Sequence, residues 1–415
     1  MSSLKRVLGF WDCVFINLAS IIGAGIFVVI GVASGLAGPA VILSMILAGI
    51  ASIFIGLTFA ELGGSIPKEG GVFEFGEELI SPFAGFLGGW LWIFAGIVGA
   101  SALGIALASY ITPLAGLKIP VTITASIIIL ITGALNLLNI KTTAKIDTVF
   151  VAFVVFVLTS FSIFGITRFN PANFSNFTPN GLNGVIEASA LLFFDYLGFT
   201  KITALGGEVK NPQKNIPLSI IFSILIVITL YVLTTISAIS LGGSAIYNSP
   251  EPLATALKNS GSVEVTLISL AAIIAMIQVL FNSILGSSRV MLAMSSKKFL
   301  PKTFKKINHN GVPTHAVIIS TIFSITLALT GNLVFVVSAT SFSYLLFFII
   351  SGFAALKLKK KITPTTVIVT SILINISLLF FLEFNAWVVN LLVILFAVLY
   401  WLARKPFHQR LSLNN

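Results

Sequence analysis

Two short motifs in this sequence could bind a small charged molecule inside an apolar segment. The first is Gly23-Ala24-Gly25, in a long apolar run near the N-terminus, and the second is Asp195 followed by Gly198 in another apolar run. A glycine-rich break in a helix leaves backbone N–H groups unpaired, which attract an anion, and carbonyl groups unpaired, which attract an ammonium group. Two such breaks facing each other would suit a zwitterion with one carboxylate and one amino group.

The acidic residue strengthens this interpretation. Small residues in membrane helices also serve as close-packing surfaces, so Gly23-Ala24-Gly25 alone does not identify a binding site. A carboxyl group in the middle of an apolar segment is costly to bury and normally faces a cavity. Asp195 beside a second break therefore favours a binding site over simple packing.

The composition requires a membrane protein. Of the 415 residues, 57% are hydrophobic and only 9% are charged, whereas soluble domains carry about 25% charged residues. Such a chain cannot cover a globule with solvated groups, which excludes soluble enzymes, nucleic-acid-binding proteins and disordered proteins. The single cysteine, Cys13, excludes an intrachain disulfide and a cysteine-based metal site, and we expect no metal and no cofactor.

Twelve apolar segments are long enough to cross a bilayer as helices. A spanning helix needs about 20 residues, and its backbone groups must be hydrogen-bonded within the segment. The runs are continuous and do not alternate with a period of two, which excludes a β-barrel. The expected fold class is an all-α integral membrane protein with 12 transmembrane helices. The segments are residues 11–34, 39–62, 83–112, 121–138, 148–167, 183–207, 218–241, 263–286, 313–330, 333–356, 364–382 and 387–403.

The basic residues predict the orientation. With the N-terminus in the cytoplasm, 21 of the 24 lysines and arginines lie on the cytoplasmic side, and three lie outside, Lys118, Arg168 and Lys258. Because cytoplasmic loops are rich in lysine and arginine, we expect a multi-pass plasma-membrane protein with both termini in the cytoplasm. The net charge of +11 then reflects orientation, and the cluster at 297–306 does not indicate a nucleic-acid partner. The stretch 61–82 is acidic instead and predicts an amphipathic surface helix.

The two breaks lie at the same depth in oppositely directed segments. Gly23 and Asp195 each lie 12 residues from the start of their segments, which is about 18 Å and close to the middle of a core about 30 Å thick. Their segments are the first and the sixth, the leading members of two blocks of five. Glycine-interrupted segments at matching positions of two inverted halves are typical of a transporter binding site.

Several longer motifs occur along the chain in a fixed order. They are Ser20-Ile-Ile-Gly-Ala-Gly-Ile-Phe27, Ala60-Glu61-Leu62 with Pro67-Lys-Glu-Gly-Gly71, Phe193-Phe-Asp-Tyr-Leu-Gly-Phe199, Gly207-Glu-Val-Lys-Asn-Pro-Gln-Lys-Asn-Ile-Pro217 and Leu285-Gly-Ser-Ser-Arg-Val-Met-Leu-Ala-Met294. Together they resemble the motifs of the amino acid–polyamine–organocation superfamily of permeases. The resemblance implies alternating access and a 5+5 inverted repeat with broken helices 1 and 6. It divides the chain into a first repeat at 1–167, a second at 168–356, and two peripheral helices with the C-terminal tail at 357–415.

The resemblance also assigns roles to residues at the breaks. The backbone N–H groups of Ala24 and Gly25 would hold the substrate carboxylate, and carbonyl groups of both helices would bind its amino group. Phe194 would be an aromatic outer gate that covers the substrate; ordinary packing is the alternative for this ring, and its position beside the break favours the gate. The implied substrate-binding residues are Ile21, Gly23, Ala24, Gly25, Phe194 and Leu197.

The sequence departs from the family pattern in its coupling residues. Some proton-coupled members carry a lysine in helix five, whereas residues 148–167 contain none and Val154 aligns near that position. Helix eight offers Asn282 and Ser283, but not the adjacent pair of hydroxyl groups typical of sodium-coupled relatives. The lysine-based proton switch of those relatives is therefore absent from this chain, and its mechanism does not carry over. A proton that binds elsewhere stays open as the coupling ion, and sodium is less favoured.

Asp195 stands where the family usually has a small neutral residue, and three interpretations are open. As a protonation site, it would couple uptake to protons. As an ionised group, it would select cationic substrates. As a structural group, it would cap a half-helix or pair with Lys201. Because acids inside a membrane are normally functional, the first two interpretations are favoured equally.

We therefore expect a secondary active transporter that carries amino acids across the plasma membrane by alternating access, with proton coupling through Asp195 as one interpretation. An exchanger of cationic amino acids or polyamines is the alternative. An intramembrane enzyme would need a second deep carboxylate or a metal site, and a channel would need a continuous polar lining; the sequence indicates neither. The expected partners are an amino acid substrate and the lipid bilayer, and the oligomeric state is left open.

Overall fold

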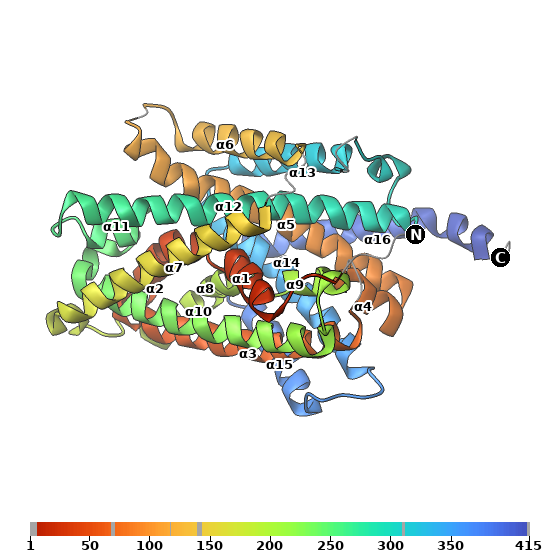
Figure 1. The fold of residues 1–415 in the computed structure, drawn as a ribbon, viewed down its shortest axis with the longest axis horizontal. Coiled ribbons are helices and arrows are strands. Elements are labelled where there is room, and N and C mark those ends of the chain that lie inside the picture. Colours follow the sequence, from red (N-terminus) through yellow and green to blue (C-terminus); the bar gives the residue numbers. More distant parts are fainter. Residues whose placement is uncertain (1–5, 68–70, 117, 139–142, 309–311, 413–415) are drawn as a thin grey trace.

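The apolar segments form long helices that run along one another, as Figure 1 shows for the computed structural model of the chain. The structure describes residues 6–67, 71–116, 118–138, 143–308 and 312–412, so residues 68–70 of the motif at 67–71 and the outermost residues of both termini lie outside it. The described residues contain no β-strand, only an isolated bridge between Leu8 and Val209. The predicted all-α fold class is confirmed.

The helices have the following bounds. The α-helices are α1 (Phe10–Ile21), α2 (Ile30–Ala37), α3 (Val41–Ser65), α4 (Gly71–Leu79), α5 (Pro82–Leu114), α6 (Val121–Asn136), α7 (Thr143–Thr167), α8 (Gly181–Leu192), α9 (Lys201–Ala204), α10 (Pro212–Gly242), α11 (Pro252–Ala256), α12 (Ser262–Ser296), α13 (Thr314–Ala328), α14 (Leu333–Leu356), α15 (Thr365–Leu379) and α16 (Phe384–Ser412). A π-helix, η1, covers Gly25–Val29, and short 3₁₀ segments are η2 (Gly38–Ala40), η3 (Pro171–Phe174), η4 (Phe193–Tyr196), η5 (Gly206–Glu208), η6 (Gly243–Ile246) and η7 (Lys302–Lys305).

The helices account for all of the predicted membrane spans. Eight stretches of the described residues are helical, long and apolar enough to cross a membrane, and one of them, Phe10–Ser65, contains the first two predicted spans. Three shorter apolar helices, α6, α13 and α15, occupy the predicted spans at 121–138, 313–330 and 364–382. The chain is thus a multi-pass membrane protein.

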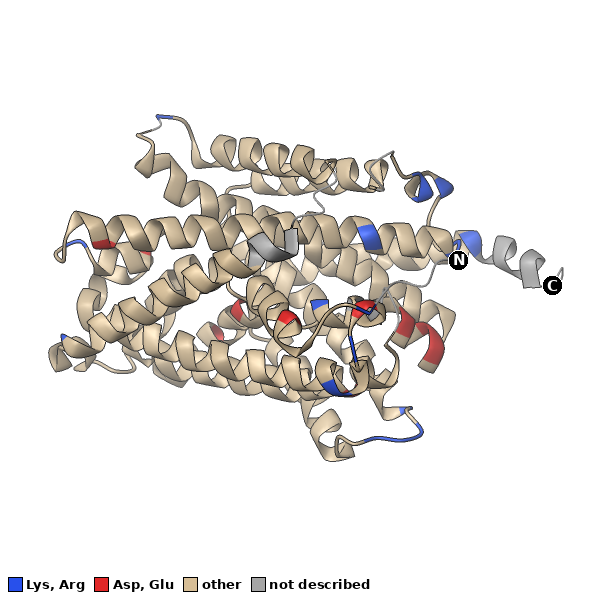
Figure 2. Ribbon diagram, viewed as in Figure 1, with Lys and Arg blue, Asp and Glu red and all other residues tan. Residues whose placement is uncertain are grey.

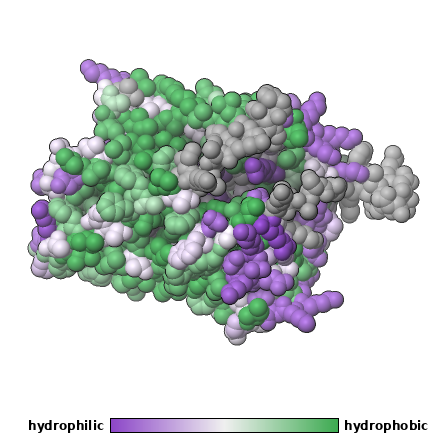
Figure 3. All heavy atoms as spheres, in the orientation of Figure 1, coloured by the Kyte–Doolittle hydropathy of each residue, from purple (hydrophilic) through white to green (hydrophobic). Residues whose placement is uncertain are grey.

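The surface matches a bilayer environment. Figure 3 shows apolar residues over much of the length of the visible face, with hydrophilic residues gathered toward the ends. In Figure 2 most of the basic residues lie at the end of the molecule that carries α4. This separation of charge agrees with the orientation that the sequence predicts.

The helix α5 lies inside the bundle and packs against α4, α6, α12, α13 and α14. Small residues allow these close approaches. A Cβ atom added at Gly96 would come within 2.1 Å of the hydroxyl oxygen of Ser287 on α12, and one at Gly104 within 2.5 Å of Ile129 on α6. Such small-residue contacts are a common way of packing helices in a membrane.

The helix α4 differs from the surface helix that the acidic stretch predicts. Its phenylalanines Phe73 and Phe75 are fully buried, at 1% and 0% exposure. Their rings lie against Phe299 and Phe59 respectively. The helix is therefore inserted into the end of the bundle, where burial of these two rings stabilises it.

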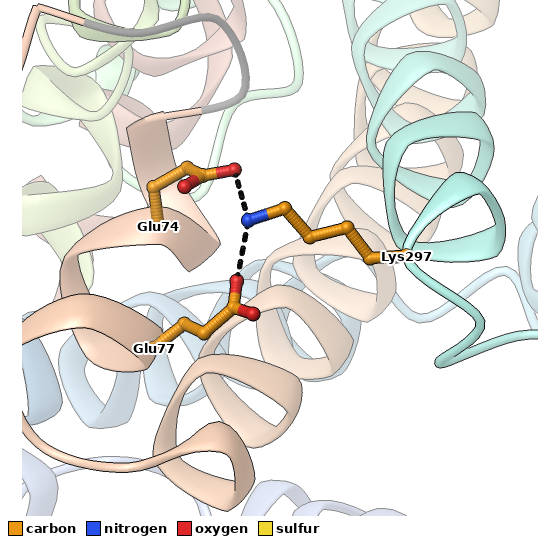
Figure 4. A network of polar contacts seen from close by, with 3 residues as sticks. All are labelled: Glu74, Glu77 and Lys297. Carbon is orange, nitrogen blue, oxygen red and sulfur yellow. Dashed lines mark hydrogen bonds and ion pairs between the residues drawn. The ribbon is translucent and has the colours of Figure 1, made fainter. Parts of the chain in front are cut away.

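A lysine joins α4 to the end of α12, as Figure 4 shows. The amino group of Lys297 lies 2.6 Å from a carboxylate oxygen of Glu74 and 2.7 Å from one of Glu77. It also lies 5.0 Å from the centre of the Phe73 ring, within cation–π range. Burial lowers the pKa of Lys297, but the hydrogen bonds and charges of the two glutamates outweigh it, and the net pKa is raised above its ordinary value.

We expect Lys297→Gln to lower the free energy of unfolding by about 1–2 kcal/mol, because the carboxylate of Glu74 then stays buried without its partner. Thermal unfolding in detergent measures this loss. Since the folded pKa is raised, the stabilisation is complete below the unfolded lysine pKa of about 10.4 and is lost as the pH rises through the folded value. The control is Lys298→Gln, whose side chain is exposed. Equal unfolding temperatures for Lys297→Gln and wild type at neutral pH would contradict this role.

Candidate functional site

The first helix is broken where the sequence predicts it. The α-helix α1 ends at Ile21, and Ile22 is extended, with φ −74° and ψ 104°. The chain becomes helical again at Ala24 and continues as the π-helix η1. Short π-helices inside longer helices are frequent at functional sites.

The sixth span is broken in the matching place. The helix α8 ends at Leu192, a 3₁₀ turn follows over Phe193–Tyr196, and Leu197 is extended, with ψ 143°. Gly198 has φ 124°, which side-chain-bearing residues rarely adopt. Helix geometry resumes only at Lys201, the first residue of α9.

The two breaks touch each other through their backbones. A Cβ atom at Gly198 would come within 2.2 Å of the Ser20 carbonyl oxygen, so the close approach requires glycine at this position. The hydroxyl of Tyr231, on α10, lies 3.3 Å from the Ile21 carbonyl oxygen and 3.4 Å from the Asp195 carbonyl oxygen. One buried hydroxyl thus lies within hydrogen-bond distance of a carbonyl from each break and can donate its single proton to either.

Two further tyrosines form hydrogen bonds between the broken segments and neighbouring helices. The Tyr110 hydroxyl donates to the Phe27 carbonyl oxygen in η1 at 2.7 Å. The Tyr196 hydroxyl, in the 3₁₀ turn, donates to the Met45 carbonyl oxygen on α3 at 3.0 Å. These bonds fix the broken segments to α5 and α3.

Asp195 lies directly against the first break. It is 1% exposed, and a Cβ atom at Gly25 would come within 2.1 Å of its Oδ1 atom. Neither carboxyl oxygen has a hydrogen-bond partner among the described residues. The carboxyl group therefore does not cap a half-helix, and it would be costly to keep ionised without a partner.

A small cavity lies between the breaks. It brings together all six predicted substrate-binding residues, Ile21, Gly23, Ala24, Gly25, Phe194 and Leu197, and it also contains Asp195 and Lys201. Its free volume is about 40 Å³, whereas sites that hold small-molecule ligands have about 300–1,000 Å³. In this conformation the cavity is therefore much smaller than such sites.

Eight of the 18 residues that line the cavity come from three other helices, and of these only Ser283 was named from the sequence, as a residue weighed for sodium binding. Ala95, Gly96, Gly99 and Leu103 on α5, Val279 and Ser283 on α12, and Thr340 and Tyr344 on α14 complete the lining. The pair Gly96 and Gly99, one turn apart on a long apolar helix, was the signal that could have pointed to α5. The hydroxyls of Ser20, Ser283 and Thr340 donate to carbonyls of their own helices, which leaves their oxygen lone pairs for a ligand.

Comparison with known proteins gives consistent matches. Residues 12–410 match the amino acid permease family. The branched-chain amino acid permease BcaP of Bacillus subtilis is 29% identical over 357 residues, which cover 80% of this chain and 76% of that protein. The methylthioribose transporter of Bacillus subtilis is 32% identical over 325 residues, covering 74% and 70%. The mitochondrial cationic amino acid transporter 3 of Arabidopsis thaliana is 29% identical over 334 residues, covering 74% and 54%.

We expect Gly198→Ala to lower the free energy of unfolding by roughly 2 kcal/mol or more, because the methyl group adds backbone strain to a collision with the Ser20 carbonyl. Thermal unfolding in detergent measures the effect. The matched control is Gly116→Ala, since Gly116 also has a positive φ, 60°, but a Cβ atom there would meet nothing within 4 Å. A loss at Gly198 no larger than the loss at Gly116 would show that the close approach of the breaks is unimportant.

Proposed function

The chain belongs to the amino acid permease family, and we propose that it carries amino acids across the plasma membrane by alternating access, with the two helix breaks as its substrate site. It is a membrane transporter and not an enzyme. The observation that carries the proposed site is the meeting of both breaks around one buried cavity. Backbone N–H and carbonyl groups that two broken helices present to one cavity would suit a zwitterionic substrate.

The substrate would be held mainly by backbone groups. We propose that the N–H groups of Ala24 and Gly25 hold its carboxylate, because they start the helical segment after the first break. The carbonyl groups of Ile21, Phe194 and Leu197 would hold its amino group. Phe194 is partly exposed and lines the cavity, which fits a ring that swings over the substrate as a gate.

Proton coupling through Asp195 follows from its position against Gly25. An ionised carboxylate at this place would repel the substrate carboxylate at the same break, so the substrate would bind best when Asp195 carries a proton. Release of the substrate and of this proton to the cytoplasm would then couple amino acid uptake to proton uptake. The coupling ion in this proposal is the proton, and sodium has no assigned role.

A cationic substrate is the second candidate, because Asp195 lines the cavity and its carboxyl oxygens accept no hydrogen bond from the described residues. If Asp195 were ionised, it would attract the second amino group of a basic amino acid or a polyamine. The relatives include both a branched-chain amino acid permease and cationic amino acid transporters, so both candidates have precedents.

Alternating access would move the inner halves of the broken helices together. The N–H groups of Val7 and Leu8 donate to the Glu208 carbonyl oxygen, and the Lys210 N–H donates to the Leu8 carbonyl oxygen. These bonds join the segment before α1 to the segment after α9. We propose that this pair opens toward the cytoplasm as a unit, with the basic end of the bundle and both termini on the cytoplasmic side.

We expect Gly25→Ala to reduce transport at least tenfold while the protein stays folded, because the new Cβ atom overlaps the side chain of Asp195. Uptake of labelled amino acids into proteoliposomes measures the loss, and thermal unfolding in detergent confirms folding. The matched control is Gly88→Ala, where a Cβ atom would make an ordinary 3.6 Å contact with Phe347. Normal transport by Gly25→Ala would refute the site.

We expect Asp195→Asn to abolish accumulation driven by a pH gradient while exchange of labelled for unlabelled substrate continues, because the residue no longer binds and releases a proton. Proteoliposomes with an imposed gradient measure both activities. The control is Glu187→Gln, which lies on α8, the helix that precedes the break, and is exposed. A selective loss of basic amino acids would favour the second candidate, and unchanged uptake of every amino acid would contradict both.

A further inference from the structure

The loop between α14 and α15 combines positive charge with an exposed apolar side chain. Four of its first five residues are lysines, and the next residue, Ile362, is 95% exposed. The lysines are Lys357, Lys359, Lys360 and Lys361. Figure 2 shows basic residues on this loop at the edge of the bundle beside α15. Residues 357–364 are called the polybasic loop below.

A buried carboxylate fixes the shape of the polybasic loop. Glu61, near the end of α3, is 7% exposed. The Ile362 N–H lies 3.1 Å from each of its carboxylate oxygens, and the Thr363 N–H donates to one of them at 2.7 Å. Hydrogen bonds to an ionised acceptor are stronger than neutral ones. Within the run of lysines, Leu358 packs against the core. The loop is therefore anchored on both sides of Lys359, Lys360 and Lys361, and Ile362 is exposed within it.

The adjoining helix brings this loop to the level of the membrane boundary. The helix α15 has 15 residues, or about 22 Å, whereas the hydrocarbon core of a bilayer is about 30 Å thick. Its lipid-facing stripe is Val369, Leu373, Ile376 and Phe380, which are 37–71% exposed. Because the helix is shorter than the core, the bilayer must extend past one of its ends or become thinner around it. Either way, Ile362 and the lysines meet the region of the lipid headgroups.

We propose that the polybasic loop is a binding site for anionic phospholipids. Ile362 would insert among the acyl chains at the boundary, and the lysine stems would extend over the apolar region to place their amino groups on the headgroup phosphate. A zwitterionic headgroup carries its own cation, whereas an anionic headgroup such as that of phosphatidylglycerol does not. Charge complementarity therefore selects the anionic lipid. The site is independent of the substrate and of Asp195.

Site-specific fluorescence quenching tests the proposal. The single native cysteine, Cys13, is buried, so a dye can be attached at position 362 in a Cys13→Ser, Ile362→Cys protein. Nanodiscs would contain mixtures of phosphatidylglycerol and phosphatidylcholine, with either lipid brominated as the quencher. We expect the anionic lipid to be preferred next to the dye by about fivefold for each lysine that reaches a headgroup, and the preference to fall toward one in high salt.

Two variants separate this site from the general charge of the protein. Replacing all four loop lysines by glutamine should bring the lipid preference close to one. The matched control replaces four exposed lysines at the same end, and it should keep the preference; these are Lys298, Lys302, Lys305 and Lys306. Glu61→Gln keeps every lysine but weakens the anchor, and it should reduce quenching of the dye by either lipid.

Three results would overturn the proposal. The first is equal quenching by anionic and zwitterionic lipid in the labelled protein with all of its lysines. The second is an equal loss of preference in the loop variant and the control variant, which would assign the effect to overall charge. The third is loss of the preference when inorganic phosphate replaces chloride at constant ionic strength, which would assign the loop to free phosphate.

Discussion

A helix that breaks inside a membrane is stable only if other groups hydrogen-bond the backbone atoms that the break exposes. This constraint governs the centre of the structure. The hydroxyl of Tyr231 lies within hydrogen-bond distance of a carbonyl oxygen from each break. The hydroxyl of Tyr110 donates to the carbonyl oxygen of Phe27 in η1. Gly198 brings the second break onto the Ser20 carbonyl with no side chain between them. Residues of both breaks line one small cavity, which is why the proposed substrate site lies there.

Asp195 is the acidic residue at the meeting point of the two breaks, and it distinguishes this site from the resembled family pattern, which usually has a small neutral residue there. The carboxyl group is buried, has no hydrogen-bond partner among the described residues, and presses against Gly25. A neutral carboxyl group is tolerable in such a place, whereas an ionised one needs a nearby cation. A proton and a cationic substrate are therefore two ways to neutralise the charge of this carboxyl group. The first would give proton-coupled transport of amino acids, and the second would give transport of basic amino acids or polyamines.

The positions of the helices and of their breaks could be predicted from the sequence, but most contacts between distant helices could not. Continuous apolar runs and the distribution of lysine and arginine located the spans, and glycines at matching depths located both breaks, because these features are local. Apart from Ser283, which was weighed only for sodium binding, the lining contributed by α5, α12 and α14 was missed. The role of Tyr231 was missed too, because nothing local shows which distant helix face meets a break. The acidic stretch at α4 suggested a surface helix, but the burial of Phe73 and Phe75 and the contacts of Lys297 depend on tertiary packing.

The most direct test of the central claim is an experimental structure with a transported amino acid bound. The account predicts the substrate carboxylate within hydrogen-bond distance of the Ala24 and Gly25 N–H groups, its amino group against the carbonyls of Ile21 and Phe194, and an enlarged cavity between α1, α5 and α8. A substrate bound at any other place, or helices one and six continuous through residues 22–23 and 197–200 in the bound state, would contradict it.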